Sequence, residues 1–263
     1  MSMNPPSKRL ERGEFASFCY QLGQTQSTGV LSIQLSANQA ELLILRRGQV
    51  FTRDSDALGR ETRQRLERIA SSSCIADFDS GLAAYPPSLG RPFSLVDWAR
   101  QHLEAQIDSA RAQRLAGELA GVRLRVNIDR LPINLDATDK RIVTAMSLPR
   151  RLDQIWPLAR APRFRLMAFV HFLRSVGALH ESGVAAAQYR PLASGSDKKS
   201  EAMRTLGLLA SADHREIKRA YRKLARSLHP DLNSGQSLSA QRAYERRLVD
   251  VNSAYRELTR SPA

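Results

Sequence analysis

The chain has 263 residues, of which 42% are hydrophobic and 25% charged, values typical of a globular protein with two or three modest cores. No stretch reaches the roughly eighteen apolar residues of a membrane span, and no secretory signal is recognisable, so we expect a cytoplasmic protein without a membrane partner. The net charge of +14 divides into excesses of +2, +6 and +6 over residues 1–92, 93–195 and 196–263, so the last two thirds favour an anionic partner.

Residues 1–92 are predicted to form a small α+β domain. A helix is indicated first by apolar residues at helical spacing, and the next apolar runs alternate as strands do: "TGVLSIQL", "AELLILRR" and "QVFTRD". Gly48 fits a hairpin with positive φ. A helix over "RETRQRLERIA" and a strand over "CIADFD" complete the domain. Cys19 and Cys74 lie within apolar patterns, so we expect core residues rather than a disulfide or a metal site.

This N-terminal pattern resembles the bacterial PATAN-type domain. The resemblance rests on "TGVL", "RRGQVF", "LGRET" and "ADFDSG" and covers most of residues 10–85. It implies a regulatory or interaction module. The segment contains no phosphate loop, paired carboxylates or nucleophile motif, so we expect no catalysis here.

Residues 93–181 are predicted to form a mostly helical domain. A long amphipathic helix or helix pair comes first, and "VRLRVNI" follows as a strand. Three helical stretches come next: "DATDKRIVTAM", with Asp136 and Asp139 as a capping pair; "RLDQIWPLA"; and "PRFRLMAFVHFLRSVGAL". Three short helices, the third of them basic, resemble a winged helix-turn-helix.

The third of these helices allows two interpretations. Arg163, Arg165 and Arg174 could face phosphates, which would make the chain a nucleic-acid-binding regulator. However, the helix is apolar on nearly all sides, and DNA readout needs exposed polar side chains at its start. We therefore expect it to pack against "RIVTAM" and "IWPLA", and nucleic acid is the unlikely partner.

The composition of residues 182–199 predicts a flexible linker, and a strongly basic helix follows it. Asp213 and Glu216 form a capping-box pattern at its start. Apolar residues repeat along one stripe, and the opposite face carries Arg215, Lys218, Arg219, Arg222, Lys223 and Arg226. A face with six cations cannot be a core, so we expect it to be exposed.

The basic helix must end near Leu228, because Pro230 disfavours helical geometry at His229 and has no amide hydrogen. A polar turn then displays His229, Pro230 and Asp231. A second amphipathic helix follows, with an apolar stripe at Tyr244, Leu248, Val251, Tyr255 and Leu258. Two antiparallel helices joined by this turn are the expected arrangement.

Residues 200–263 resemble the J domain of Hsp70 co-chaperones. The resemblance rests on "LGLLASADHREIKRAYRKLARSLHPDLN" and "RRLVDVNSAYREL". It implies that His229, Pro230 and Asp231 engage Hsp70 and trigger its ATP hydrolysis, with Asn233 just behind them. It also implies that the basic helix docks onto an acidic Hsp70 surface through Lys218, Arg219, Arg222, Lys223 and Arg226.

Four positions depart from the J-domain pattern. Leu228 replaces a usual tyrosine, Leu232 replaces a usual basic residue, and Ala202 and Met203 stand where the first helix usually has aromatics. The first helix is thus the part that the pattern specifies least.

The expected protein is a multidomain α+β chain. We expect a PATAN-like α+β domain at residues 1–92 and a helical winged-helix-like domain at residues 93–181. A linker at residues 182–199 and an all-α J-domain helical hairpin at residues 200–263 follow. We expect a co-chaperone of a DnaK-type Hsp70, with residues 1–181 as the adaptor for an unknown client or target protein. We expect no enzyme activity, cofactor or metal, since no His or Cys has ligand spacing to His229.

Overall fold

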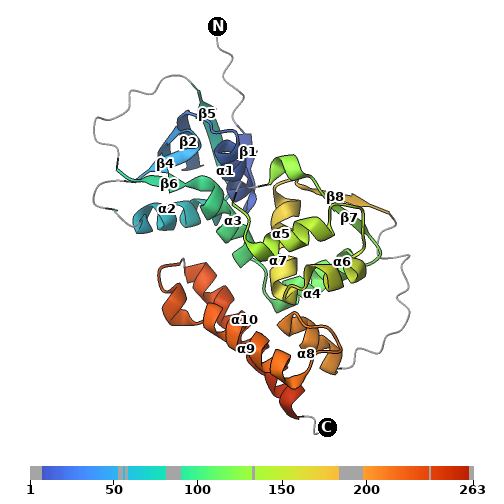
Figure 1. Cartoon of the computed structure of the whole chain (residues 1–263). Helices are drawn as coiled ribbons and strands as arrows, with labels where there is room; N and C mark the ends of the chain where they lie inside the picture. Colours follow the sequence, from blue (N-terminus) through green and yellow to red (C-terminus); the bar gives the residue numbers. More distant parts are fainter. Residues whose placement is uncertain are drawn as a thin grey trace. The chain divides into compact units, whose positions relative to one another are not determined.

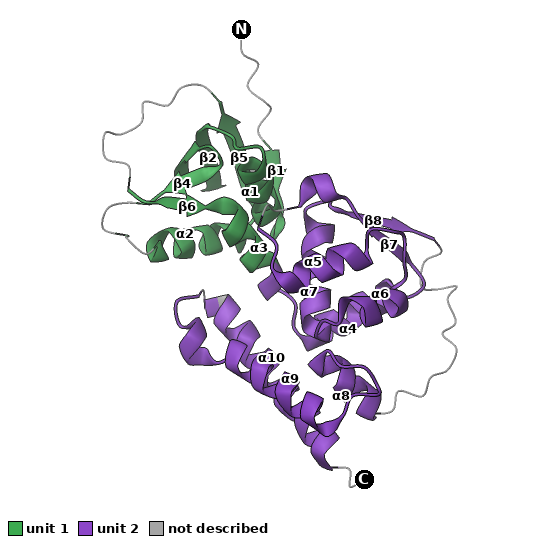
Figure 2. Cartoon of the chain, viewed as in Figure 1, with its two compact units in different colours: residues 1–103 green, residues 104–263 purple. Residues whose placement is uncertain are grey.

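The computed structural model describes residues 8–52, 56, 59–80, 90–131, 134–183, 198–236 and 238–260. The chain divides into two compact units, residues 1–103 and 104–263 (Figure 2). The expected linker at residues 182–199 lies largely outside the described residues, since only positions 182, 183, 198 and 199 are described. No helix in the described part of the chain combines the length and apolar character that a bilayer-spanning segment needs.

The first unit contains a six-stranded antiparallel sheet with the order β1-β5-β2-β3-β4-β6. The strands are β1 (Lys8–Leu10), β2 (Gly29–Ser36), β3 (Gln39–Arg46), β4 (Gln49–Phe51), β5 (Cys74–Asp79) and β6 (Pro92–Ser94). Four of these strands were predicted. The edge strands β1 and β6 were not, because their sequences show no alternating apolar pattern and they are defined by pairing with distant strands.

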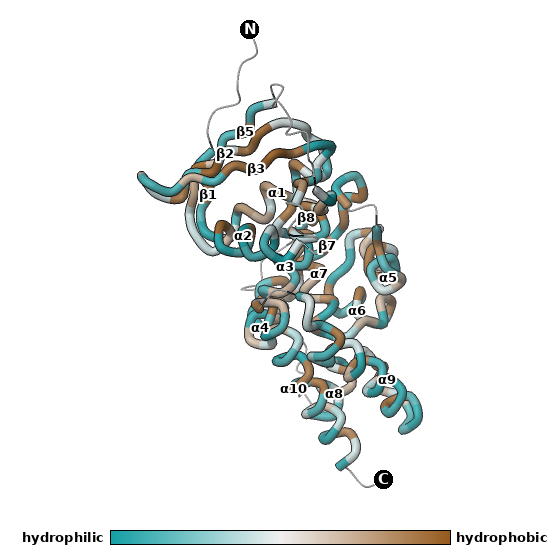
Figure 3. The backbone as a smooth tube through the Cα atoms, turned by 90° about the vertical axis from the view of Figure 1, so that its left-hand side faces the viewer, coloured by the Kyte–Doolittle hydropathy of each residue, from teal (hydrophilic) through white to brown (hydrophobic). Residues whose placement is uncertain are grey.

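Helices α1 (Glu14–Gln24), α2 (Arg60–Ala70) and α3 (Leu95–Ala105) lie on one face of this sheet (Figures 1 and 3). The core between helices and sheet contains the largest buried side chains of the unit, with the rings of Phe15 and Trp98 meeting edge to face at 6.1 Å. Cys19 and Cys74 are buried free thiols, as predicted, and burial raises the pKa of both.

The hairpin between β3 and β4 turns at Arg47 and Gly48, which have φ values of 49° and 73°. The predicted positive φ of Gly48 is therefore confirmed. A Cβ atom at Gly48 would collide with the backbone of Gly23, so glycine also permits the close approach of α1 to this turn.

The second unit begins with a helical middle region, drawn in green and yellow in Figure 1. It contains α4 (Ser109–Glu118), β7 (Arg123–Val126), the 3-10 turn η1 (Ile128–Arg130), α5 (Ala137–Ala145), α6 (Leu152–Ala159), α7 (Arg163–Ser175) and β8 (Leu179–Ser182). Strands β7 and β8 pair antiparallel. The sequence left open one long helix or a helix pair before β7, and the structure has the pair, α3 and α4; β8 was not predicted.

Helix α7 is buried along most of its length, as its apolar composition predicted. Its most extensive contacts are with α4, α8 and β8, whereas the sequence suggested residues 141–146 and 155–159. The difference arises because α5 and α6, which carry those residues, pack chiefly against each other.

The C-terminal part of the second unit consists of α8 (Lys198–Leu206), α9 (His214–Ser227), the 3-10 turn η3 (Pro230–Asn233) and α10 (Leu238–Arg260). A cluster of buried residues joins the three helices: Ala202, Met203, Leu206, Ile217, Leu228, Val251, Ala254 and Leu258. The hairpin of α9 and α10 is confirmed. Helix α8 adds a third element, although Ala202 and Met203 take the place of aromatics.

Candidate functional site

Helix α9 begins at the predicted capping box. The Asp213 carboxylate accepts a hydrogen bond from the Glu216 amide at 2.7 Å, and the Glu216 carboxylate accepts one from the Asp213 amide at 3.1 Å. Two amides at the start of the helix thereby gain acceptors, which fixes where α9 begins.

The apolar stripe of α9 faces α8 and α10. Ile217 belongs to the buried cluster, and the rings of Tyr221 and Tyr255 stack at 4.1 Å between α9 and α10. Leu224 and Leu248 pack against the same cluster. Leu228, which stands where the J-domain pattern has a tyrosine, is 3% exposed and closes the cluster at the end of α9.

The opposite face of α9 is charged and exposed. Its six cations are all exposed, and none forms an ion pair with another described residue: Arg215, Lys218, Arg219, Arg222, Lys223 and Arg226. Figure 3 shows α9 as mainly hydrophilic. Because no described carboxylate pairs with these charges, they generate a positive field along this face of α9.

The turn after α9 displays His229, Pro230 and Asp231. His229 has an extended backbone with φ −64° and ψ 135°, as the following proline favours. Its Nδ1 atom accepts a hydrogen bond from the Asp231 amide at 3.3 Å. The side chains of His229 and Asp231 are 53% and 86% exposed, so the turn leaves both accessible to solvent.

Asn233 braces this turn from behind. Its amide nitrogen donates to the carbonyl of Ser227 at 3.0 Å and to the carbonyl of His229 at 2.9 Å. One side chain therefore ties the last turn of α9 to the start of η3. The sequence pattern indicated Asn233 as a position but not this role.

Leu232 is 65% exposed beside Asp231. In the J-domain pattern this position usually carries a positive charge. An apolar side chain therefore lies next to the exposed carboxylate, and the exposed cations lie on α9.

Residues 202–262 match the family described as the DnaJ domain. They form a J domain. The chain is 42% identical over 60 residues to the chaperone protein DnaJ of Allorhizobium ampelinum, a match that covers 23% of this chain and 14% of that protein. It is also 67% identical over 30 residues to DnaJ of Desulfitobacterium hafniense, covering 11% and 8%.

A third relative, DnaJ 2 of Nocardia farcinica, is 57% identical over 37 residues, or 14% of this chain and 10% of the relative. The chain therefore spans only about a seventh or less of these relatives. No solved structure is significantly similar to the chain. The similarity concerns the J domain alone, and the PATAN-type and winged-helix resemblances remain predictions.

The three arginines that could have contacted DNA are paired with carboxylates. Arg165 binds Glu104 at 2.6 Å, Asp136 at 3.1 Å and the fully buried Asp139. Arg163 binds Glu201, and Arg174 binds Glu118 at 3.0 Å and Glu181 at 2.9 Å. These pairs leave α7 little free positive charge for phosphates.

Within the described residues, no cluster of three or more His, Cys, Asp or Glu side chains has the geometry of a metal site. The His229 ring lies 3.5 Å from Asp231 and participates in the turn that both residues form.

Proposed function

We propose that this chain is a co-chaperone of a DnaK-type Hsp70, and that its J domain binds the Hsp70 and stimulates its ATP hydrolysis. The observation that supports this proposal is the exposed turn of His229, Pro230 and Asp231 beside the unpaired cations of α9. The basic face supplies long-range attraction and orientation, and Asp231 offers a charge-assisted hydrogen bond to a cation of the partner.

The proposed docking residues are those of the turn and of α9: His229, Pro230, Asp231, Asn233, Lys218, Arg219, Arg222, Lys223 and Arg226. The J domain breaks no bond in this proposal. The J domain binds the hydrolysis-competent conformation of the Hsp70 more tightly than the other conformation. This difference in affinity shifts the Hsp70 toward the competent conformation.

Residues 1–181 serve in this proposal as the adaptor that selects the client or target. The exposed face of the N-terminal sheet, which carries Leu42 and Ile75 at 60% and 44% exposure, suits protein contacts. The PATAN-like and winged-helix-like domains, the linker at 182–199 and the cytoplasmic location are parts of the same proposal.

The test is single-turnover ATP hydrolysis by a DnaK-type Hsp70 with His229→Gln, compared with His214→Gln as a matched control. His214 is exposed at the other end of α9, outside the turn. We expect His229→Gln to reduce stimulation at least about 30-fold, as loss of a central contact worth about 2 kcal/mol would. His214→Gln should stimulate like the parent. Equal stimulation by both variants would contradict the proposal.

A further inference from the structure

The J domain also contacts the middle helices of its own unit, through a face that does not include the exposed side of α9. Glu201 of α8 binds Arg163 of α7, and Asp250 of α10 accepts a hydrogen bond from Ser109 of α4. Arg246 lies 3.7 Å from Asp108 just before α4. Polar contacts from α8 and α10 therefore converge on α4 and α7.

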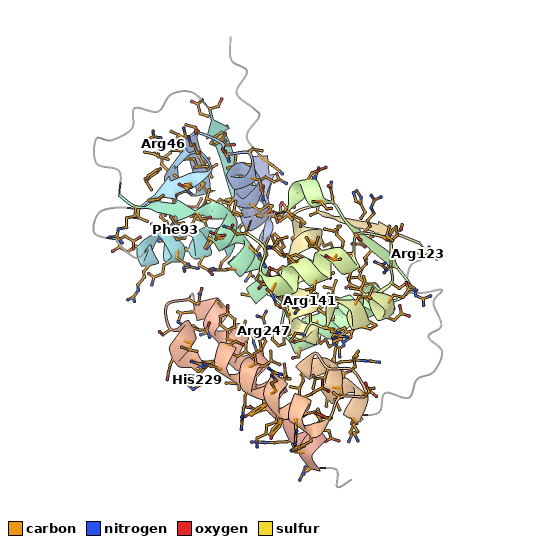
Figure 4. The ribbon with its side chains drawn as sticks, viewed as in Figure 1. Arg46, Phe93, Arg123, Arg141, His229 and Arg247 are labelled. Carbon is orange, nitrogen blue, oxygen red and sulfur yellow. The ribbon has the colours of Figure 1, made fainter. Side chains whose placement is uncertain are left out.

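Arg247 is the central group of this contact. It is a buried cation with 7% exposure on a helix whose other arginines are exposed. Its guanidinium donates hydrogen bonds to the backbone carbonyls of Glu104 at 2.6 Å and Ile107 at 3.3 Å. Figure 4 shows Arg247 on the side of α10 nearest the middle helices and His229 at the turn away from them.

Two aromatic rings enclose the same guanidinium. Its central carbon lies 5.3 Å from the ring centroid of Phe164 on α7 and 5.8 Å from that of Tyr244 on α10. Burial lowers the pKa of Arg247, and Tyr244 and Glu104 oppose that shift. Phe164 also packs against the buried cluster of the J domain, so α7 contributes to the core of both regions.

The backbone after α8 also lies close to the backbone just before α7. Gly207, just after α8, has φ 72°, and a Cβ atom there would lie 2.7 Å from the nitrogen of Pro162. A larger residue would therefore push the end of α8 away from the start of α7.

Space remains beside these anchors. Two cavities of about 390 Å³ and 620 Å³ are lined by residues of both the J domain and the middle helices. The Nε atom of Arg247 is buried without a hydrogen-bond partner in the described structure. The contact thus depends on a few polar and aromatic anchors rather than on continuous apolar packing, which makes Arg247 its most critical group.

We propose that Arg247 is a positioning residue that holds the J domain on α7 and on the segment that joins α3 to α4, so that its exposed turn and basic helix are presented in one fixed orientation. The docking itself is independent of the proposed function. The docking would also restrict the direction from which an Hsp70 can approach the J domain, and only this consequence rests on the proposed function. The middle region is then a platform for the J domain as well as a part of the adaptor.

The experiment measures the distance between spin labels on the full chain. Leu158→Cys on α6 and Arg256→Cys on α10 place the labels at exposed positions on the two sides of the contact. The native Cys19 and Cys74 are buried, which confines labelling to the introduced thiols. The parent should give one narrow distance distribution, Arg247→Ala should lose it, and Arg242→Ala, at an exposed position of the same helix, should keep it.

Arg247→Met is the second variant, because methionine keeps a long buried side chain but cannot form the two hydrogen bonds. If circular dichroism shows that Arg247→Ala is unfolded, Arg247→Met is measured in its place. A broad distribution in the parent, or a narrow one in a folded Arg247 variant, would overturn the docking proposal. ATPase stimulation is measured in parallel. A parent that docks but does not stimulate contradicts the proposed function and leaves the docking intact.

Discussion

Helices α7 and α9 are both rich in arginine, but they use it in opposite ways. In α7, Arg163, Arg165 and Arg174 are paired with carboxylates of α8, α5 and neighbouring segments. In α9, the cations stand exposed and form no ion pair with another described residue. The comparison teaches that positive charge in a sequence indicates a binding surface only when the fold leaves that charge unpaired.

Among the substitutions that test this comparison, we expect the largest loss of stability at Arg165. Arg165→Ala leaves the fully buried Asp139 without its cation, which should lower the free energy of unfolding by about 3 to 5 kcal/mol. Arg174→Ala on the same helix removes two ion pairs whose arginine is 43% exposed, so it should cost about 1 kcal/mol or less. Urea denaturation of the second unit measures both. Equal losses would contradict the larger contribution assigned to the pair with the buried Asp139.

An intermediate effect is expected on α9. Reversing the charges of Lys218 and Arg222 to glutamate should slow association with the Hsp70 roughly tenfold at low salt, because steering by exposed charges would be lost. The parent should lose affinity as salt rises, whereas the double variant should be nearly insensitive to it. Stopped-flow binding at several salt concentrations measures this. Arg174→Glu is the control, and an equal loss of rate there would break the distinction between the two helices.

The smallest effect is expected for nucleic acid. The full chain should bind duplex DNA only weakly and without sequence preference, with a Kd on the order of 1 to 100 μM near physiological salt, as expected for non-specific attraction to a basic protein. Fluorescence anisotropy with a random duplex and a selected pool measures this. Sub-micromolar, sequence-selective binding would instead favour the regulator hypothesis and a DNA-binding role for the middle region.

The sequence predicted those parts of the fold whose signals are local. The capping pairs Asp213 with Glu216 and Asp136 with Asp139, the end of α9 before Pro230 and the turn at Gly48 all depend on residues close together in the chain. The displayed tripeptide was predictable for the same reason, since proline stereochemistry acts on its immediate neighbours.

The parts that were not predicted depend on distant partners. Arg247 is one of several arginines in α10, and its burial depends on carbonyls about 140 positions earlier in the chain. One signal was present: Arg247 lies between Tyr244 and Val251, three and four residues away, on the apolar stripe. A cation at a position where the helical repeat places a buried residue indicates a specific hydrogen-bond or ion-pair partner for that side chain. Strands β1, β6 and β8 were missed because they are defined by their neighbours rather than by their own pattern.

The outer strands of the N-terminal sheet have a consequence for the solubility of the protein. A long, flat edge offers unpaired amides and carbonyls to any extended polypeptide and so invites aggregation. Here β1 and β6 are three residues long, β1 begins with Lys8 and Arg9, and β6 begins with Pro92. Strands β1 and β6 therefore give an incoming strand few backbone groups to pair with, which limits extension of the sheet at these two strands.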